Sequence, residues 1–210
     1  MSVTISPIYL LDVGSNSAVE AELWDAIEEQ QLADWEALWM PSLIEAIKRL
    51  HAAGVPRSKW PQSRHWHWRD KLQAIEQLLA HKTFSIVCRG ETQGMMVVNL
   101  TKTARHLAQR AKPLAYVEYL ETAPWNRPEL FGRPRYRGVG MLLIRAAIAL
   151  SAEEEFKGRI GLHSLPQADR FYREKCGMTD LGEDNGYQNL RYFEMTPEQA
   201  QAFVKGEGRK

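Results

Sequence analysis

The spacing of apolar residues along the chain changes from one region to the next, and each change predicts a different kind of element. Residues 3–13 are rich in β-branched and apolar side chains and predict a strand. This strand ends at the turn sequence of residues 14–17, where Ser17 is a candidate cap for a helix beginning near Ala18. We therefore expect a strand and then a helix at the start of the chain.

Helical spacing dominates residues 34–81. Apolar side chains recur every three or four positions and predict a helix from Asp34 that Gly54 ends. After a break at residues 56–61, the same spacing predicts a second helix from Trp68 to about His81. The two stripes consist of Trp35, Leu38, Trp39, Leu43, Ile44, Ile47 and Leu50, and of Trp68, Leu72, Ile75, Leu78 and Leu79.

Strand-like segments follow from residue 83 onward. Residues 83–89 and 95–100 flank turn residues 90–94 and predict a β-hairpin. The further elements are strands at residues 114–122, 159–164 and 187–195, helices at 138–155 and 166–175, and a frayed end at 206–210. This order predicts a mixed α/β (α+β) fold with one central sheet.

Composition and charge exclude several classes of protein. Among 210 residues, 44% are hydrophobic and 25% charged, which is typical of a folded globular protein and not of a disordered chain, collagen or a coiled coil. The 27 Lys and Arg nearly balance the 26 Asp and Glu, so no overall field draws the chain to nucleic acid or to an anionic membrane. No apolar run reaches the length of a membrane span, and we expect no signal peptide. Cys88 and Cys176 lack metal-binding spacing, so we expect no disulfide framework, no metal and a cytoplasmic location.

The candidate chemistry is concentrated between a predicted strand end and the helix that follows. Here Arg135-Tyr136-Arg137-Gly138-Val139-Gly140 precedes a helix whose only charge up to Leu150 is Arg145. Glycines at a helix start let the backbone approach a ligand, and the free N–H groups there bind phosphate. A tight strand-to-helix turn is the alternative interpretation. The glycine spacing fits neither a Rossmann fingerprint nor a P-loop.

This stretch resembles the pyrophosphate motif of the GNAT superfamily of acyl-CoA-dependent N-acyltransferases. Leu120, Thr122 and Pro124 match the end of the strand that precedes the motif, and Arg135, Gly138 and Gly140 match the loop. A second match is Leu165-Pro166-Gln167-Ala168, with Phe171-Tyr172 and Cys176-Gly177-Met178 after it. The resemblance implies that acetyl-CoA binds at Leu120, Thr122, Arg135, Tyr136, Arg137, Gly138, Val139, Gly140 and Met141.

The resemblance also implies a fold and a division of the chain. It implies a central, mostly antiparallel mixed sheet with helices on both faces, in one domain over residues 1–210. Residues 1–82 would form mainly the acceptor side, 83–195 the sheet with the coenzyme A motifs, and 196–210 a tail. The chain departs from the family pattern in a longer loop between Pro124 and Arg135, in Leu165 where Asn is common, and in one extra residue between Tyr172 and Gly177.

The activity implied is direct transfer of an acetyl group from acetyl-CoA to an amine. The amine must lose a proton before it attacks, so a base is needed. Glu118 is the first candidate and Glu121 the second, on opposite faces of one strand, and an exposed strand carboxylate paired with an arginine is the alternative for either. Tyr172 is the candidate acid for the departing thiolate, or else a buried aromatic residue of an amphipathic helix.

Other signals leave the acceptor undefined. Arginines 127, 133, 135 and 137 suit the phosphates of coenzyme A, and so do Lys102, Arg105, Arg110 and Lys112, although a solvated helix face is the favoured interpretation of this second group. His65 and His67 lack acidic or Cys partners at zinc-ligand spacing. We expect a small-molecule or peptide amine as acceptor, no nucleic acid and no membrane, and the oligomeric state stays open, a homodimer included. The alternative function is an acyl-CoA-binding sensor or interaction module without turnover; an aminoglycoside-type enzyme would need an acidic cleft.

Overall fold

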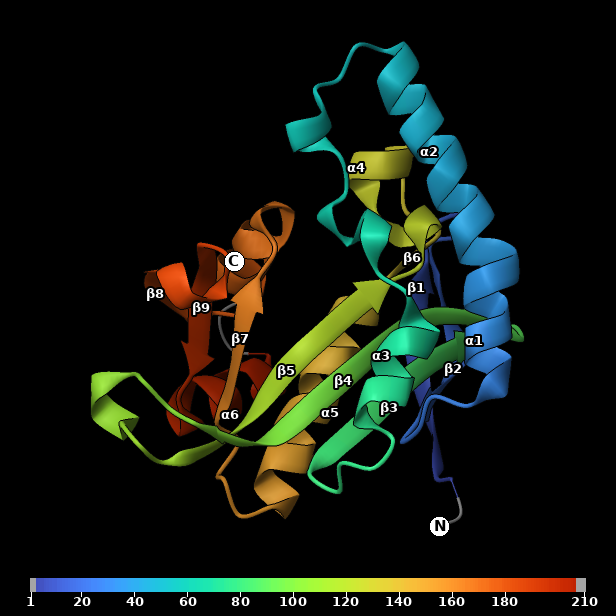
Figure 1. Ribbon diagram of the computed structural model, residues 1–210. Coiled ribbons are helices and arrows are strands. Elements are labelled where there is room, and N and C mark those ends of the chain that lie inside the picture. Colours follow the sequence, from blue (N-terminus) through green and yellow to red (C-terminus); the bar gives the residue numbers. More distant parts are fainter. Residues whose placement is uncertain (1–2, 207–210) are drawn as a thin grey trace. The chain divides into compact units, whose positions relative to one another are not determined.

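The computed structural model describes residues 3–206, which form a mixed α/β fold with one nine-stranded sheet (Figure 1). The strand order is β6-β1-β2-β3-β4-β5-β7-β9-β8. The strands are β1 (Ile5–Asp12), β2 (Ser17–Trp24), β3 (His81–Cys88), β4 (Glu91–Thr103), β5 (Pro113–Thr122), β6 (Tyr136–Arg137), β7 (Ile160–Ser164), β8 (Thr179–Asp184) and β9 (Leu190–Met195). β5 and β7 pair in parallel, whereas β1 with β2, β1 with β6, β2 with β3, β7 with β9 and β8 with β9 pair antiparallel. The predicted mixed, mostly antiparallel sheet is confirmed.

The helices of the described residues differ in length and character. They are α1 (Glu29–Asp34), α2 (Met40–Ala52), α3 (Trp68–Ile75), α4 (Pro128–Phe131), α5 (Val139–Glu153) and α6 (Pro197–Lys205). A π-helical turn, Trp35–Trp39, joins α1 to α2, and a second one covers Phe171–Lys175. The predicted helices over residues 34–54, 68–81, 138–155 and 166–175 are therefore present, with shorter bounds for the second, since α3 ends at Ile75.

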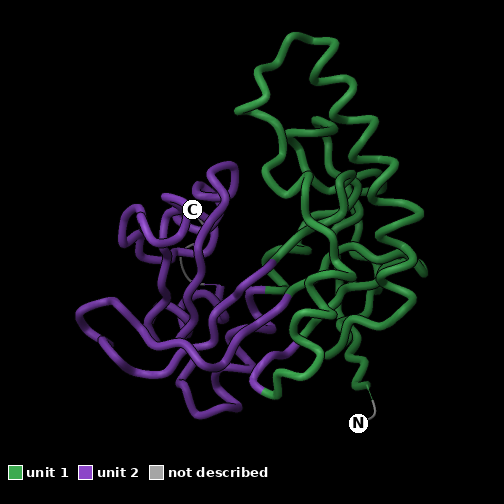
Figure 2. The backbone as a smooth tube through the Cα atoms, viewed as in Figure 1, with its two compact units in different colours: residues 1–79, 83–96, 120–143 green, residues 80–82, 97–119, 144–210 purple. Residues whose placement is uncertain are grey.

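The chain folds into two compact units (Figure 2). The first comprises the residues up to 79, 83–96 and 120–143, and the second comprises 80–82, 97–119 and the residues from 144 onward. The first unit holds the β1–β2 hairpin, helices α1 to α4 and the start of α5. The second holds most of α5, strands β7 to β9 and α6. The number of domains stays a prediction.

The helix predicted from Ala18 is wrong. Ser17–Trp24 is strand β2, which pairs with β1 along its whole length. The Asp12 carboxylate accepts hydrogen bonds from the backbone N–H groups of Gly14 and Ser15, at 2.8 and 3.2 Å, and so forms a turn where a helix cap was expected. Apolar and polar residues alternate with period two after this turn, which is a strand pattern.

Three further differences lie in the β-rich part of the chain. The turn predicted at residues 90–94 is a two-residue turn at Arg89 and Gly90, both with positive φ, so Gly94 lies inside β4. Strand β8 is polar and was not predicted, and the strand expected from residue 187 begins at Leu190. Residues 197–205, expected in a tail, form α6 behind a capping box made by Thr196 and Gln199. Most of the predicted frayed end, residues 207–210, lies outside the described residues.

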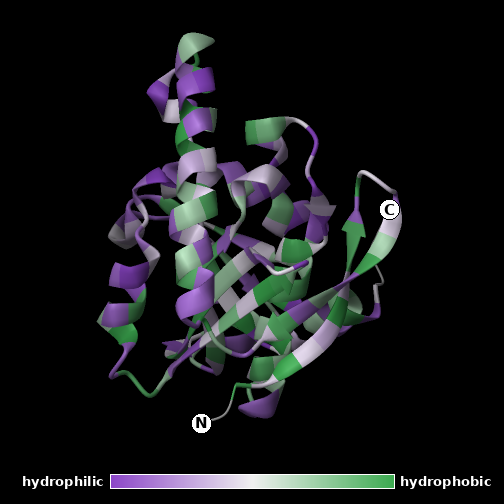
Figure 3. Cartoon of the chain, turned by 90° about the vertical axis from the view of Figure 1, so that its right-hand side faces the viewer, coloured by the Kyte–Doolittle hydropathy of each residue, from purple (hydrophilic) through white to green (hydrophobic). Residues whose placement is uncertain are grey.

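Helices α2 and α5 differ in how much of their surface is buried. Along α2, hydrophilic and hydrophobic residues follow one another (Figure 3), and Leu43 and Ala46 are buried while Ile44 is 46% exposed. α5 is apolar on most sides, and its buried residues are Val139, Leu143, Ile144, Ala146, Ala147, Ile148 and Leu150. Arg145 reaches the α6 end, where its guanidinium donates to the Val204 carbonyl at 3.2 Å. The prediction of a buried α5 is confirmed.

Candidate functional site

The candidate base Glu121 is buried near the end of β5. The Trp68 indole N–H donates to Glu121 Oε2 at 2.7 Å, and Arg127 Nη1 lies 3.8 Å from Oε1. Trp68 is fully buried, so this carboxylate is enclosed by an indole and a guanidinium. Burial raises the pKa of the Glu121 carboxyl, and the Trp68 hydrogen bond and the Arg127 charge oppose the shift.

Arg127 has a different partner from the one its sequence position suggested. Its guanidinium donates to Glu129 Oε1 at 2.9 Å and to Ser63 Oγ at 3.1 Å, and the side chain is buried. A buried guanidinium needs carboxylate partners, and two carboxylates supply them here. The assignment of Arg127 to coenzyme A phosphates is therefore wrong.

The predicted phosphate loop leads directly into α5. Tyr136 is buried and pairs with Asp12 of β1, and the exposed Gly138 has φ +104°, a backbone conformation that favours glycine. The Arg135 guanidinium lies 5.2 Å from the Tyr136 ring centroid and also pairs with Glu91. Val139 is buried at the first position of the helix, so the loop is held on both sides while Gly138 stays open.

Gly94 lets the start of α5 approach β4 closely. A Cβ atom at Gly94 would lie 2.6 Å from Val139 Cγ1 and 3.0 Å from Leu143 Cδ1. Real Cβ atoms do not come within 2.6 Å of other heavy atoms, so a side chain at Gly94 would force Val139, at the first position of α5, to shift. Sequence reasoning missed this residue because it assigned Gly94 to a turn.

The candidate base Glu118 has a different environment. Its side chain is 29% exposed, and its Oε2 atom has two hydrogen-bond contacts, one from the adjacent strand β4 and one from β3, the next strand beyond it. His81 Nε2 of β3 lies 3.2 Å from Oε2, and the Asn99 amide of β4 donates to the same oxygen at 3.4 Å. Neither His81 nor Asn99 was singled out from the sequence, because nothing in the local pattern of their strands points to Glu118.

A hydrogen-bonded chain of side chains begins two residues before Glu118. The Tyr116 hydroxyl lies 2.7 Å from His163 Nδ1, and His163 Nε2 lies 2.9 Å from Asp184 Oδ2. The His163 ring stacks on Tyr187 at 4.0 Å between centroids. Burial lowers the pKa of His163, and hydrogen bonds from Arg105 and His163 hold the pKa of Asp184 well below its usual range. Because the Asp184 carboxylate can only accept, the proton of the His163 imidazole lies on Nε2. The Tyr116 hydroxyl therefore donates to His163 Nδ1.

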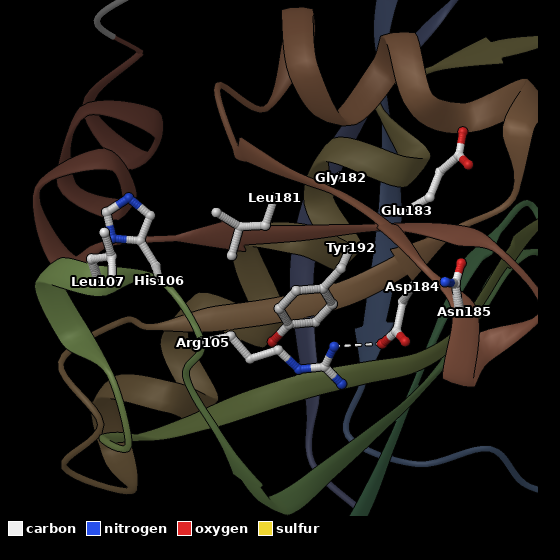
Figure 4. Close-up of a pocket in the computed structure, with 9 residues that line it drawn as sticks. All are labelled: Arg105, His106, Leu107, Leu181, Gly182, Glu183, Asp184, Asn185 and Tyr192. Atoms are coloured by element: carbon white, nitrogen blue, oxygen red, sulfur yellow. Dashed lines mark hydrogen bonds and ion pairs between the residues drawn. The ribbon is translucent and has the colours of Figure 1, made fainter.

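The same network borders a cavity of about 360 Å³ in the second unit (Figure 4). Arg105 pairs with Asp184 across it, and the Arg105 guanidinium lies 4.4 Å from the Tyr192 ring centroid. The lining residues are Arg105, His106, Leu107, Leu181, Gly182, Glu183, Asp184, Asn185 and Tyr192. Arg105 is paired with Asp184, and the exposed residues Lys102, Arg105, Arg110 and Lys112 lie on the end of β4 and in the connection to β5, not on the helix face that the sequence favoured.

The candidate acid Tyr172 lies in the π-helical turn Phe171–Lys175 and is buried. The Cys176 N–H donates to the Phe171 carbonyl five residues earlier, at 3.1 Å. A π-helical turn holds one more residue than an α-helical turn, so it absorbs the extra residue between Tyr172 and Gly177. Burial raises the pKa of the Tyr172 hydroxyl and of the Cys176 thiol, which keeps both protonated at neutral pH.

The structure groups these residues by unit. Glu121 and the predicted coenzyme A residues from Leu120 to Met141 belong to the first unit, whereas Glu118 and Tyr172 belong to the second. Within residues 3–206, no group of three or more His, Cys, Asp or Glu side chains is arranged to hold a metal ion, and Cys88 and Cys176 are free. In the same part of the chain, no helix has the length and apolarity that a membrane crossing requires.

Comparison with solved structures identifies the fold. No protein-family model matches the sequence, and no curated protein matches it. RimJ from Mycobacterium smegmatis, in complex with CoA-disulfide, matches with a TM-score of 0.52 and 16% identity over 99% of this chain and 95% of its own. FeeM, an N-acyl amino acid synthase from uncultured soil microbes, matches with a TM-score of 0.51 and 10% identity over 87% of this chain and 94% of its own. The chain has the GNAT fold.

A third structure extends the comparison. A bacterial toxin matches with a TM-score of 0.52 and 13% identity over 65% of this chain and 79% of its own. The fold that the motifs from Leu120 to Gly140 and from Leu165 to Met178 implied is therefore confirmed. At these identities the GNAT fold is what the comparison shows, and the reaction has to be argued from the residues of this chain.

Proposed function

We propose that the chain is an N-acetyltransferase that transfers an acetyl group from acetyl-CoA directly to an amine. The observation that carries the proposal is the glycine-opened start of α5, where the exposed Gly138 has φ +104° and a buried helix follows. The first turn of a helix offers free N–H groups and the positive end of the helix dipole, which favour a pyrophosphate. RimJ, a neighbour in fold, is in complex with CoA-disulfide, which supports the same ligand here.

The chemistry requires a base and an acid. An amine with a pKa of about 10.4 is mostly protonated at pH 7 and must lose a proton before it attacks. We assign this step to Glu118, because its carboxylate is partly exposed while that of Glu121 is enclosed by Trp68 and Arg127. Tyr172, whose raised pKa keeps it protonated, is assigned as the acid.

The proposed steps balance as follows. The ammonium gives one proton to Glu118, and the nitrogen lone pair forms a bond to the thioester carbonyl carbon. Backbone N–H groups at the end of β5 polarise that carbonyl. The C–S bond then breaks as the carbonyl re-forms, Tyr172 protonates the sulfur, and the second proton of the nitrogen restores the Tyr172 hydroxyl. Glu118 returns its proton to solvent, so no metal and no covalent enzyme intermediate is required.

The first experiment tests acetyl-CoA binding. Calorimetry and thermal melts are measured for the wild type, for Gly138→Asp and for Gly132→Asp. Both glycines have positive φ, so both variants gain the same charge and a similar backbone strain, but only Gly138 lies at the start of α5. We expect acetyl-CoA to raise the melting temperature of the wild type and of Gly132→Asp, and not that of Gly138→Asp. Equal binding by all three proteins contradicts the assignment of the phosphate site.

The second experiment tests catalysis. Release of the coenzyme A thiol is measured against a panel of small-molecule and peptide amines. We expect turnover with some of these amines, and a loss of about 100-fold or more in Glu118→Gln without a change in acetyl-CoA affinity. Acetyl-CoA binding without turnover on any amine contradicts the enzyme and favours an acyl-CoA-binding module. If Glu121→Gln is inactive and Glu118→Gln is fully active, Glu121 is the base.

A further inference from the structure

Two side chains, Asn99 of the adjacent strand β4 and His81 of β3 beyond it, contact the same oxygen of Glu118. His81 Nε2 and Asn99 Nδ2 both approach Oε2, at 3.2 and 3.4 Å, and neither bond goes to Oε1. The His81 side chain is only 9% exposed and Asn99 is buried, whereas the Glu118 side chain is 29% exposed. The two donors therefore lie behind a carboxylate that remains accessible.

The orientation of Asn99 is fixed by its other contacts. Asn99 Oδ1 accepts from the Thr101 backbone N–H at 2.8 Å and from the Thr101 hydroxyl at 2.7 Å. Two donors at Oδ1 identify that atom as the carbonyl oxygen, so the NH₂ group faces Glu118. Asn99 is thus a donor to Glu118 whatever the pH.

The charge state of His81 follows from its second nitrogen. Nδ1 is buried and has no hydrogen-bond partner among the described residues. A proton on Nδ1 would be a buried donor without an acceptor, which disfavours both the imidazolium and the Nδ1–H tautomer. His81 is therefore neutral with its proton on Nε2, and it donates that proton to Glu118 Oε2.

We propose that His81 is a positioning residue for Glu118. Its Nε2–H and the Asn99 amide stabilise the carboxylate form and orient it, so that Oε1 takes the proton of the acceptor ammonium. In that step the N–H bond breaks, its electron pair stays on nitrogen and an O–H bond forms at Oε1. The inference rests on the proposed role of Glu118 as base.

The titratable groups around Glu118 limit what a pH profile can report. His81 of β3 and the hydroxyls of Tyr116 and Tyr119 of β5 interact with Glu118, and Tyr187 acts on both tyrosines. The pKa values of Tyr116 and Tyr119 are raised, so both hydroxyls stay protonated at acidic and neutral pH. The two tyrosine hydroxyls therefore do not contribute to the acidic limb of a pH profile.

The kinetic test compares His81→Phe with His81→Gln. Phe keeps the ring volume without a donor, whereas the Gln amide nitrogen takes about the position of Nε2. We expect kcat of His81→Phe to fall by about 10- to 100-fold with the KM for acetyl-CoA unchanged, and His81→Gln to recover most of the rate. Loss of a donor to a carboxylate raises its pKa, so the acidic limb of kcat/KM moves to higher pH in His81→Phe only. An acceptor amine of low pKa keeps its own ionisation out of this limb.

Two results overturn the proposal. One is a wild-type rate and profile in His81→Phe. The other is equal impairment of His81→Phe and His81→Gln, because the donor would then not be what matters.

A spectroscopic test separates this inference from the proposed function. In wild type, ¹⁵N spectra are expected to show a neutral Nε2–H tautomer for His81. The ¹³C titration of the Glu118 carboxyl is expected to shift to higher pH in His81→Phe and not in His81→Gln. Neither measurement needs turnover, so both remain decisive if no amine is acetylated. An Nδ1–H tautomer, or an unchanged Glu118 titration in His81→Phe, overturns the proposal even if the enzyme is active.

Discussion

The indole N–H of Trp68 donates to the buried carboxylate of Glu121 at 2.7 Å. Trp68 is the first residue of α3, and Glu121 is the second-last residue of β5, so this bond joins two elements that lie 53 residues apart in the chain. A buried carboxylate without its donor would carry a large desolvation cost. We therefore expect the Trp68–Glu121 pair to contribute to the stability of the fold.

Trp68→Phe should destabilise the protein by about 1–3 kcal/mol, because it leaves a buried carboxylate oxygen without its donor. The matched control is Trp60→Phe, which removes the indole donor to the Val55 carbonyl at a half-buried site and should cost about 1 kcal/mol. Urea denaturation of the three proteins measures both effects. Equal losses in the two variants would mean that burial of the Glu121 carboxylate adds nothing.

The stability of the wild type should depend on pH through Glu121. Burial raises the pKa of this carboxyl above its ordinary value of 4.5, so the folded state keeps a proton that the unfolded chain has released. The contribution of Glu121 to the free energy of unfolding is therefore fully present below about pH 4.5 and falls as the pH rises through the folded pKa. In Glu121→Gln this loss is absent. As the pH rises, the melting temperature of the wild type should fall relative to that of the variant. A difference in melting temperature that stays constant with pH would contradict the raised pKa of Glu121.

Gly94→Ala should weaken acetyl-CoA binding from a distance. The new Cβ would meet the side chains of Val139 and Leu143 in the first turns of α5, so we expect overpacking there to cost about 1–3 kcal/mol of stability. We expect the acetyl-CoA Kd to rise on the order of tenfold, about 1.4 kcal/mol. Gly54→Ala is the control, because its positive φ makes it costly too, while nothing lies within 4 Å of the added Cβ. If calorimetry gives the same acetyl-CoA Kd for both variants, the packing at Gly94 does not affect acetyl-CoA binding.

Tyr172→Phe should lower turnover by about 100- to 10,000-fold with acetyl-CoA affinity near that of the wild type, because it removes only the proposed proton donor. Tyr192→Phe, which removes another buried hydroxyl in the same unit, should retain turnover. Steady-state kinetics under conditions where chemistry limits the rate, together with calorimetry, measure both. If Tyr172→Phe turns over as fast as Tyr192→Phe, Tyr172 is a packing residue.

The sequence by itself determined the elements whose side chains repeat with a clear period. Helices α2 and α5 and strand β5 are predicted because each has one or more faces that must be buried. The loop from Arg135 to Gly140 is recognised from its glycines, which let the backbone approach a ligand. The resemblance of its motifs was sufficient for the fold. Strand β8 was missed because it is a polar edge strand, where only one neighbour pairs and burial leaves little pattern.

Only the tertiary structure decided which carboxylate is enclosed and which is open. Glu118 and Glu121 are three residues apart in one strand, and the sequence offers both as candidate bases on opposite faces of it. Their environments differ because Trp68 and Arg127 enclose Glu121, while His81 and Asn99 contact one oxygen of Glu118. These contacts join residues of different elements, six to 53 positions apart, and hydrogen bonds of this kind depend on the register of strands and the packing of helices, which no local pattern encodes.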